Sequence, residues 1–201
     1  MSDKLRNPKE PLGKRRRRLI RYKRMAELVE AEPLSAEEFA EILARHQEFA
    51  ASGGGGGYWH TFATAGPGTG TVFGVYLGQE REETAGAQAL LEHQRLEGLD
   101  LRGVKLPFAD LCGVSCRDQD LSGADLSGSL LTDADFSGSS FRGAKLTGAD
   151  FSRSELIRCD LREADLAGAD FEHADLTGAD LRGAKMEGTK FAGAAMESVL
   201  Q

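Results

Sequence analysis

From residue 96 onward, large apolar side chains recur at every fifth position of the chain. The series begins at Leu96 and ends at Met196, and each member is Leu, Phe or Met except Cys116. A small residue, most often Ala, stands two positions before most members, and Gly stands two positions after most of them. A period of five fits neither the 3.6 residues of a helix nor the two of a strand. The pattern therefore predicts a stacked repeat, in which each unit buries its apolar side against its neighbours.

The consensus of the repeat is Ala-Asp-Leu-x-Gly, as in Ala124–Gly128, Ala164–Gly168 and Ala179–Gly183. If the large and small apolar residues both point inward, the other three positions face solvent or form a turn. Gly after the large residue tolerates the positive φ that repeated corners require. The same glycines argue against a helix, because each would cost about 1 kcal/mol there.

These pentapeptides resemble those of the pentapeptide-repeat proteins, and the resemblance covers about residues 96–201. It implies a mainly β fold, a right-handed quadrilateral β-helix with four pentapeptides to a coil and the large residue inside. The repeats would then make about five coils.

The N-terminal half has a different pattern, which predicts helices and a hairpin. Residues 1–13 are expected to form a disordered basic tail and residues 14–34 a basic helix that Pro33 ends. Ser35 and Glu38 form a capping box for a second helix, whose apolar side carries Phe39, Ile42, Leu43, His46 and Ala50. Apolar runs at residues 58–62 and 72–77 flank a Gly/Pro/Thr turn and predict a β-hairpin. We expect residues 35–95 to cap the open end of the β-helix; recognition of a partner through Trp59 is the alternative.

Charge is unevenly distributed along the chain, whose net charge is −7. Residues 1–30 carry 11 Lys or Arg against 4 Asp or Glu, residues 31–95 carry 3 against 9, and residues 96–201 carry 11 against 19. With four repeats to a coil, residues twenty apart stack, so each side of the β-helix can be followed as a column. Lys105, Asp125, Lys145, Asp165 and Lys185 alternate in one column, and the preceding side pairs Asp with Arg two residues on. Both of these sides are expected to be charge-balanced.

The other two sides hold most of the excess negative charge and form the candidate acidic interaction face. Its residues are Asp110, Asp118, Asp133, Asp135, Asp150, Glu155, Asp170, Glu172 and Asp175. A one-sided acidic surface can steer a basic partner toward it. The alternative is that Asp in this motif serves solubility and hydrogen bonds at the edge of the coil.

A basic cluster in the first expected helix is a second candidate for binding. It consists of Lys14, Arg15, Arg16, Arg17, Arg18, Arg21, Lys23 and Arg24. Clustered Lys and Arg attract nucleic acid or anionic surfaces. A solvated arm, an arm that pairs with the chain's own acidic region, and an acidic protein or lipid partner are the alternatives. At the other end, Met196, Val199 and Leu200 could pair with a second copy of the chain and give a dimer or higher oligomer.

No residues form a recognisable catalytic or metal-binding arrangement, so we expect no cofactor and no small-molecule substrate. The loop Gly66–Thr71 lacks the Lys of a phosphate-binding loop, and the four histidines share no ligand spacing. The repeat phase directs Cys112 outward but Cys116 and Cys159 inward, which argues against a shared metal. The sequence has no apolar run of membrane-spanning length, no signal-peptide core and an odd number of cysteines, which favours a cytoplasmic protein.

Together these features favour a non-enzymatic interaction or scaffold protein that presents a rigid acidic β-helix surface to a protein partner. The resemblance supplies the alternative, because some pentapeptide-repeat proteins confer quinolone or antibiotic resistance. Those members resemble duplex DNA in shape and charge and protect type II topoisomerases such as gyrase.

Overall fold

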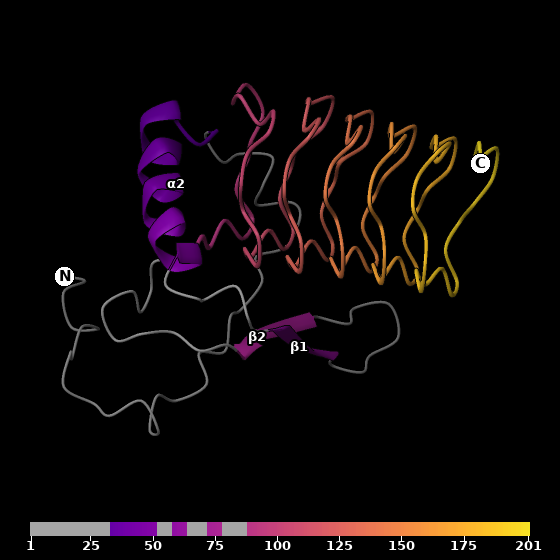
Figure 1. Ribbon diagram of the computed structural model, residues 1–201, viewed down its shortest axis with the longest axis horizontal. Coiled ribbons are helices and arrows are strands. Elements are labelled where there is room, and N and C mark those ends of the chain that lie inside the picture. The colour runs from indigo at the N-terminus through magenta and orange to yellow at the C-terminus, as the bar shows by residue number, and fades with distance from the viewer. Residues whose placement is uncertain (1–32, 52–57, 64–71, 78–87) are drawn as a thin grey trace.

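The computed structural model describes residues 33–51, 58–63, 72–77 and 88–201. Helix α2 (Ala36–Ala51) is followed by strands β1 (Tyr58–Ala63) and β2 (Val72–Leu77), and then by a stack of coils. Figure 1 shows α2 standing at one end of this stack and the C-terminus at the other. The expected tail (1–13) and nearly all of the expected basic helix (14–34) lie outside the described residues.

Helix α2 begins at the capping box that the sequence predicts. The Glu38 carboxylate accepts the Ser35 N–H at 3.1 Å, and the Ser35 hydroxyl accepts the Glu38 N–H at 3.2 Å. These two bonds satisfy N–H groups that would otherwise lack partners at the helix start. Phe39, His46 and Phe49 are buried on one side of the helix.

Strands β1 and β2 form the predicted antiparallel hairpin. Tyr58 pairs with Leu77 at its open end, and Ala63 pairs with Val72 next to the turn. The turn itself lies outside the described residues. Figure 1 shows the hairpin below the coils, whereas α2 stands at their end.

The coils have a period of twenty residues, so each takes four pentapeptides, as predicted. Parallel bridges join residues twenty apart, as from Lys105 to Asp125 and from Asp125 to Lys145. Further bridges of this kind follow along the chain, and the last joins Asp180 to Leu200. The Leu106 N–H donates to the Asp125 carbonyl at 2.8 Å, which is the type of bond that holds one coil on the next. The first bridge begins at Leu90, before the boundary expected at residue 96.

The interior of the coils is filled by the large residue of each pentapeptide. Phe136, Phe141 and Phe151 meet edge to face, with ring centroids 5.1 to 6.0 Å apart. Phe151 stacks on Phe171 at 4.9 Å, and Phe171 stacks on Phe191 at 5.5 Å. Such rings bury large apolar areas and gain further energy from their mutual orientation, so the repeat builds one continuous core.

The corners of the coils impose positive φ on the residue two positions after the large one. This holds at every corner from residue 93 to residue 198, whether Gly or another residue occupies it. A large corner residue is accommodated by Gly one coil later: a Cβ on Gly128 would lie 2.5 Å from the Phe108 ring. The same relation joins His173 to Gly193. The Gly positions are therefore set by neighbouring coils as well as by backbone strain.

The Asp of the repeat closes a local turn. In most pentapeptides that contain it, one carboxylate oxygen accepts the backbone N–H two residues later, as Asp120 does from Ser122 at 2.9 Å. The same bond occurs at Asp110, Asp125, Asp135, Asp150, Asp160, Asp165, Asp170, Asp175 and Asp180. Hydrogen bonding at the coil edge, one of the two roles considered for these carboxylates, is therefore observed.

Among the described residues, no helix has the length and apolar content needed to cross a bilayer.

Candidate interaction surface

The bridges divide the outside of the coils into four faces, each named here after one of its residues. The Asp180 face follows the bridges through Asp120, Ser140, Asp160 and Asp180, and the Lys145 face follows those from Lys105 to Lys185. The Asp150 face follows those from Leu90 to Lys190, and the Glu155 face follows those from Arg95 to Ala195.

On the Asp180 face, Asp160 and Asp180 each form an ion pair with the Arg two residues later. Arg182 binds Asp180 through two nitrogens, at 2.9 and 2.7 Å, and Arg162 binds Asp160 in the same way. Arg162 also reaches Asp180, one coil away, at 3.7 Å. The hydrogen bond from Arg182 is the main reason why the pKa of Asp180 falls from 3.8 to about 2. These carboxylates therefore stay ionised and neutralised by neighbours.

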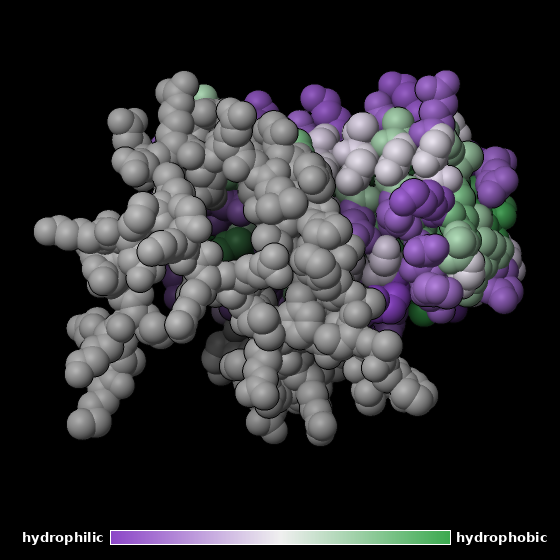
Figure 2. Space-filling model, turned by 90° about the horizontal axis from the view of Figure 1, so that it is seen from below, coloured by the Kyte–Doolittle hydropathy of each residue, from purple (hydrophilic) through white to green (hydrophobic). Residues whose placement is uncertain are grey.

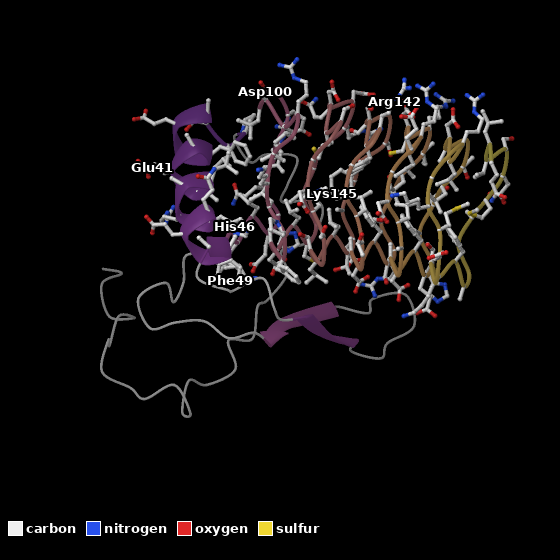
Figure 3. The ribbon with its side chains drawn as sticks, in the orientation of Figure 1. Glu41, His46, Phe49, Asp100, Arg142 and Lys145 are labelled. Atoms are coloured by element: carbon white, nitrogen blue, oxygen red, sulfur yellow. The ribbon has the colours of Figure 1, made fainter. Side chains whose placement is uncertain are left out.

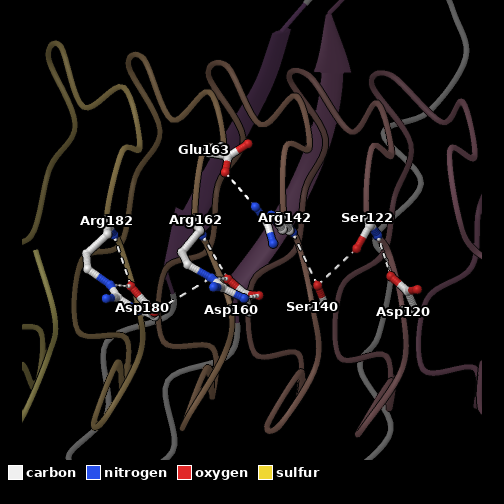
Figure 4. A network of polar contacts seen from close by, with 9 residues as sticks. All are labelled: Asp120, Ser122, Ser140, Arg142, Asp160, Arg162, Glu163, Asp180 and Arg182. Carbon is white, nitrogen blue, oxygen red and sulfur yellow. Dashed lines mark hydrogen bonds and ion pairs between the residues drawn. The ribbon is translucent and has the colours of Figure 1, made fainter.

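One pentapeptide of this face departs from the pattern and is compensated across coils. Ser140 replaces the Asp, so the Arg142 guanidinium binds Glu163 on the next coil instead, at 2.7 Å. Ser140 shares a hydrogen bond with Ser122. Figure 4 shows these residues as a single network along the face.

The Lys145 face alternates in sign along its bridges, as predicted. Lys145 lies 3.7 Å from Asp125, and Lys185 lies 3.5 Å from Asp165. The lysine side chains are mostly exposed, so each pair contributes little to stability.

The Asp150 face differs from the prediction at its start. Asp110 is fully buried, so its assignment to the exposed acidic face was wrong. Burial, and then the nearby carboxyl of Glu92, raise the pKa of Asp110 well above its usual value. Burial also raises the pKa of Asp150.

Two other acidic residues on this side are paired with basic groups. Arg153 binds Asp133, with Nε 2.9 Å from the carboxylate, and Lys190 binds Asp170 at 2.8 Å. Glu172 is exposed. This face therefore presents less free negative charge than its sequence indicates.

The Glu155 face keeps more of its charge accessible. Asp135 is nearly buried and binds Arg117 at 3.1 Å, but Glu155 is exposed and Asp175 is partly exposed. Asp118 is exposed at a corner with positive φ, above Gly138. No basic group of the described residues lies within ion-pair distance of Glu155, Glu172 or Asp175.

A family model described as pentapeptide repeats (8 copies) matches this chain at residues 120–156 and again at residues 154–193. These lie within the coils that the bridges define. The coils are pentapeptide repeats. The repeat predicted from the sequence is thus confirmed, and a right-handed β-helix is the fold that it supports.

Three solved protein structures are similar to part of this chain. Rfr23 from the cyanobacterium Cyanothece 51142 is 28% identical, covers 48% of this chain and 63% of its own, and gives a TM-score of 0.31. HetL from Nostoc sp. PCC 7120, which is involved in the regulation of heterocyst differentiation, is 27% identical, with coverage of 56% and 64% and a TM-score of 0.30. Full-length QnrB1, a plasmid-mediated fluoroquinolone resistance protein, is 16% identical, with coverage of 55% and 62% and a TM-score of 0.38.

The matched part of each of these proteins is just under two thirds of its length. Comparison with curated protein sequences gives no match.

Within the pentapeptide-repeat region, accessible negative charge lies on the Glu155 face and at its corners. We name Glu155, Glu172, Asp175 and Glu197 the acidic patch. Glu155 and Asp175 are bridge partners, Glu172 lies just before Asp175 across the corner, and Thr177 donates a hydrogen bond to Glu197 at 3.2 Å. Figure 2, viewed from below, shows hydrophilic side chains interspersed with apolar ones on the later coils. Glu197 was not among the candidate residues, although the twenty-residue period places it beside Thr177.

The three cysteines of the pentapeptide-repeat region are buried, and none of them forms a disulfide. Cys112, which the repeat phase directs outward, lies outside the core cluster but is nevertheless buried, with its thiol 3.1 Å from the Thr132 carbonyl oxygen. Burial raises the pKa of Cys159 to about 12, which keeps the thiol protonated and unreactive at neutral pH. In the part of the chain that the structure describes, no three His, Cys, Asp or Glu side chains gather where they could hold a metal ion.

The remaining candidate residues lie at the two ends of the chain. The basic cluster Lys14–Arg24 lies outside the described residues, so binding of nucleic acid or protein by it stays a prediction. Met196 and Val199 are partly exposed in the last coil, and Leu200 is 51% exposed.

Proposed function

We propose that this protein is a non-enzymatic interaction protein that presents the acidic patch of a rigid β-helix to a protein partner with a basic surface. The observation that carries the proposal is the contrast between faces. On the Asp180 face Asp160 and Asp180 are bound by arginines, whereas Glu155, Glu172 and Asp175 have no basic neighbour within ion-pair distance among the described residues. Unneutralised charge on one side raises the rate of encounter with a partner of opposite charge.

Rigidity of the surface is supported by the ladder of backbone bonds and by helix α2, which we infer caps the first coil. The Leu34 N–H donates to the Arg95 carbonyl at 3.0 Å, and the Ala89 N–H donates to Nδ1 of the buried His46 at 3.0 Å. Phe39 joins the core cluster of the coils. Figure 3 shows His46 and Phe49 on the side of α2 toward the coils and Glu41 on the other side.

Such a cap removes the exposed core and the free bridging groups of an open coil end, which would otherwise favour aggregation. A preorganised surface also loses little conformational entropy on binding. The acidic patch is therefore preorganised for binding.

A pair of charge-reversal variants tests the acidic patch. The double variant Glu155→Lys with Glu172→Lys reverses charge in the patch, and Glu163→Lys with Glu187→Lys makes the same change in net charge elsewhere on the coils. These four positions are exposed glutamates. Capture from an extract of the native host should recover one stoichiometric partner with the wild type and with the control variant, but not with the patch variant. Equal capture by both variants would remove the patch from the account.

The same one-sided charge also suits the second candidate, a DNA-mimicking protein that protects gyrase or confers antibiotic resistance. A supercoiling assay with purified gyrase, with and without a fluoroquinolone, separates the two functions. Protection at micromolar protein would favour the DNA mimic. Unchanged supercoiling and unchanged drug-induced cleavage would eliminate it and leave the first proposal in place.

Self-association through the last coil is a further part of the proposal. Met196 and Val199 pack at the edge of the core cluster while remaining partly exposed, and Leu200 is half exposed. Burial of these side chains against a second copy would be favourable. Light scattering across a range of concentrations should show a dimer or higher oligomer that Leu200→Asp weakens; a monomeric mass at all concentrations would contradict this.

A further inference from the structure

Leu130 interrupts the polar pattern on the outside of the Asp150 face. Its bridge partners one coil before and one coil after are Asp110 and Asp150. Its chain neighbours, Ser129 and Leu131, are buried on the core side, so the side chain of Leu130 points away from the core. Leu130 is nevertheless fully buried, and it is not part of the core cluster. Leu90, in the same column, is 44% exposed.

The burial extends to a compact group around Leu130. Cys112 is fully buried, Thr132 is 1% exposed and Ser137 is 8% exposed. We name Cys112, Leu130, Thr132 and Ser137 the Leu130 patch. None of these side chains carries a charge, whereas the equivalent pentapeptide position of Thr132 is an exposed or partly exposed Arg at residues 102, 142, 162 and 182.

The covered area has a sharp limit along the coils. Asp150 and Ser152, one coil after Leu130 and Thr132, are partly exposed, and Glu172 on the following coil is exposed. A regular stack of similar coils would expose each equivalent position equally. Another segment of the chain therefore covers the Leu130 patch from outside and ends before the coil of Asp150.

The position of the β1–β2 hairpin matches this limit. Columns ten residues apart lie on opposite sides of a twenty-residue coil, so the Asp150 face lies opposite the Asp180 face. Figure 3 shows Asp100 and Arg142, on the Asp180 side, at the top, and Figure 1, in the same orientation, shows the hairpin below the earlier coils. Figure 4, viewed from the Asp180 face, shows the strands behind the coils. The views agree that the hairpin lies along the Asp150 face.

We propose that the Leu130 patch is an intramolecular docking site for the β1–β2 hairpin. A two-stranded hairpin alone is marginally stable in water and needs a surface to pack on. The strands YWHTFA and VFGVYL contain no acidic or basic residue other than His60, which suits an uncharged surface. The docked hairpin occupies the earlier coils of this face and leaves the acidic patch on the later coils open.

Docking of the hairpin on the Leu130 patch is independent of the proposed function, because it involves contacts within the chain. It differs from the expectation that the hairpin caps the end of the β-helix, since α2 stands at that end. It also gives a reason for the departure from the repeat consensus at Leu130.

Hydrogen exchange of the full-length chain, followed by mass spectrometry, tests the docking. Leu130→Asp restores the usual residue of the repeat, so the coil should fold while the docking surface acquires a charge. The amides of β1 and β2 should exchange about 10- to 100-fold faster, as expected for loss of one buried Leu contact. Amides of the coil interior, such as those of Leu146 and Leu166, should keep their protection. Leu200→Asp, an identical change at an exposed bridge position of another face, should leave the hairpin unchanged.

Thr132→Arg is the second variant, because other pentapeptides of this chain carry Arg at that position and the coil accommodates it. Faster exchange in the hairpin with intact coil protection in either variant supports the proposal. Hairpin amides that keep their wild-type protection in both variants would overturn it, as would a wild-type hairpin whose amides are unprotected.

Discussion

The Asp180 and Glu155 faces are built from the same pentapeptide and yet present different surfaces. On both, the Asp carboxylate accepts the N–H two residues later, as Asp180 does from Arg182 and Asp175 does from Thr177. On the Asp180 face that later residue is often Arg, whose guanidinium also binds the carboxylate. On the Glu155 face the residue two positions after Asp175 is Thr177, and no basic group of the described residues lies within ion-pair distance of Asp175, whereas Asp135 is bound by Arg117 of the preceding coil. The fold thus uses the same carboxylate in both places, and one neighbouring residue decides whether its charge is available to a partner.

The largest expected effect comes from the core that both faces share. Phe151→Ala removes a fully buried ring that stacks on Phe171 and should reduce the free energy of unfolding by about 3–5 kcal/mol. Chemical denaturation measures the loss. Exchange of Asp160 and Asp175 amides should accelerate together; selective loss on one face would show that the faces are not parts of one cooperative unit.

A smaller effect of opposite sign on the free energy of unfolding is expected for Asp110→Asn. Burial raises its pKa, so its contribution to stability is present below its unfolded pKa near 3.8 and is lost as pH rises through the folded value. Asp110→Asn keeps an oxygen acceptor for the Cys112 N–H and removes the buried charge. We expect a gain of about 1–3 kcal/mol in unfolding free energy at pH 7, which should disappear below about pH 4. Urea denaturation at both pH values measures it, and a loss at pH 7 would contradict the burial argument.

The matched substitution on the Asp180 face should act in the other direction and less strongly. The pKa of Asp180 is lowered to about 2, so its contribution is present above the unfolded value near 3.8 and is lost as pH falls toward 2. Asp180→Asn should therefore cause a modest loss of stability at pH 7, and the loss should shrink as the pH approaches 2. Thermal unfolding followed across this range checks the trend; a variant more stable than wild type at pH 7 would contradict the ion-pair account.

The smallest effect on the free energy of unfolding is expected for a substitution on the Lys145 face. Lys145→Ala removes an exposed pair with Asp125 at 3.7 Å and should change the unfolding free energy by no more than about 0.5 kcal/mol. Denaturation at low and high salt should give similar differences between the two proteins. A loss of more than about 1 kcal/mol would show that the alternating column is a structural element of the coil.

Much of the coil could be predicted from the sequence because the repeat is local and strict. The period of five, the inward positions and the alternating charges of the Lys145 face all follow from one rule applied along the chain. The exceptions depend on contacts between distant segments. Asp110 and Cys112 are buried although both occupy outward positions, which no position within the repeat reveals. An internal signal was Leu130, an apolar residue between two Asp residues of the same outward column.

The candidate acidic surface was predictable only in outline. The charges of residues twenty apart predict the two faces with excess acid. Side-chain length and rotamer, however, decide which carboxylates reach a cation. Arg153 reaches one coil back to Asp133, and Lys190 does the same to Asp170. Glu155 has no such neighbour among the described residues, so it stays accessible although it occupies an equivalent bridge position.

Carbodiimide labelling of carboxylates, read by mass spectrometry with and without the captured partner, tests most directly whether the acidic patch is the contact surface. The account predicts that Glu155, Glu172 and Glu197 react readily in the free protein and lose reactivity in the complex, while Glu163 and Glu187 react equally in both. Protection of Glu163 and Glu187 with unchanged labelling of Glu155 and Glu172 would place the partner on the charge-balanced faces and contradict it.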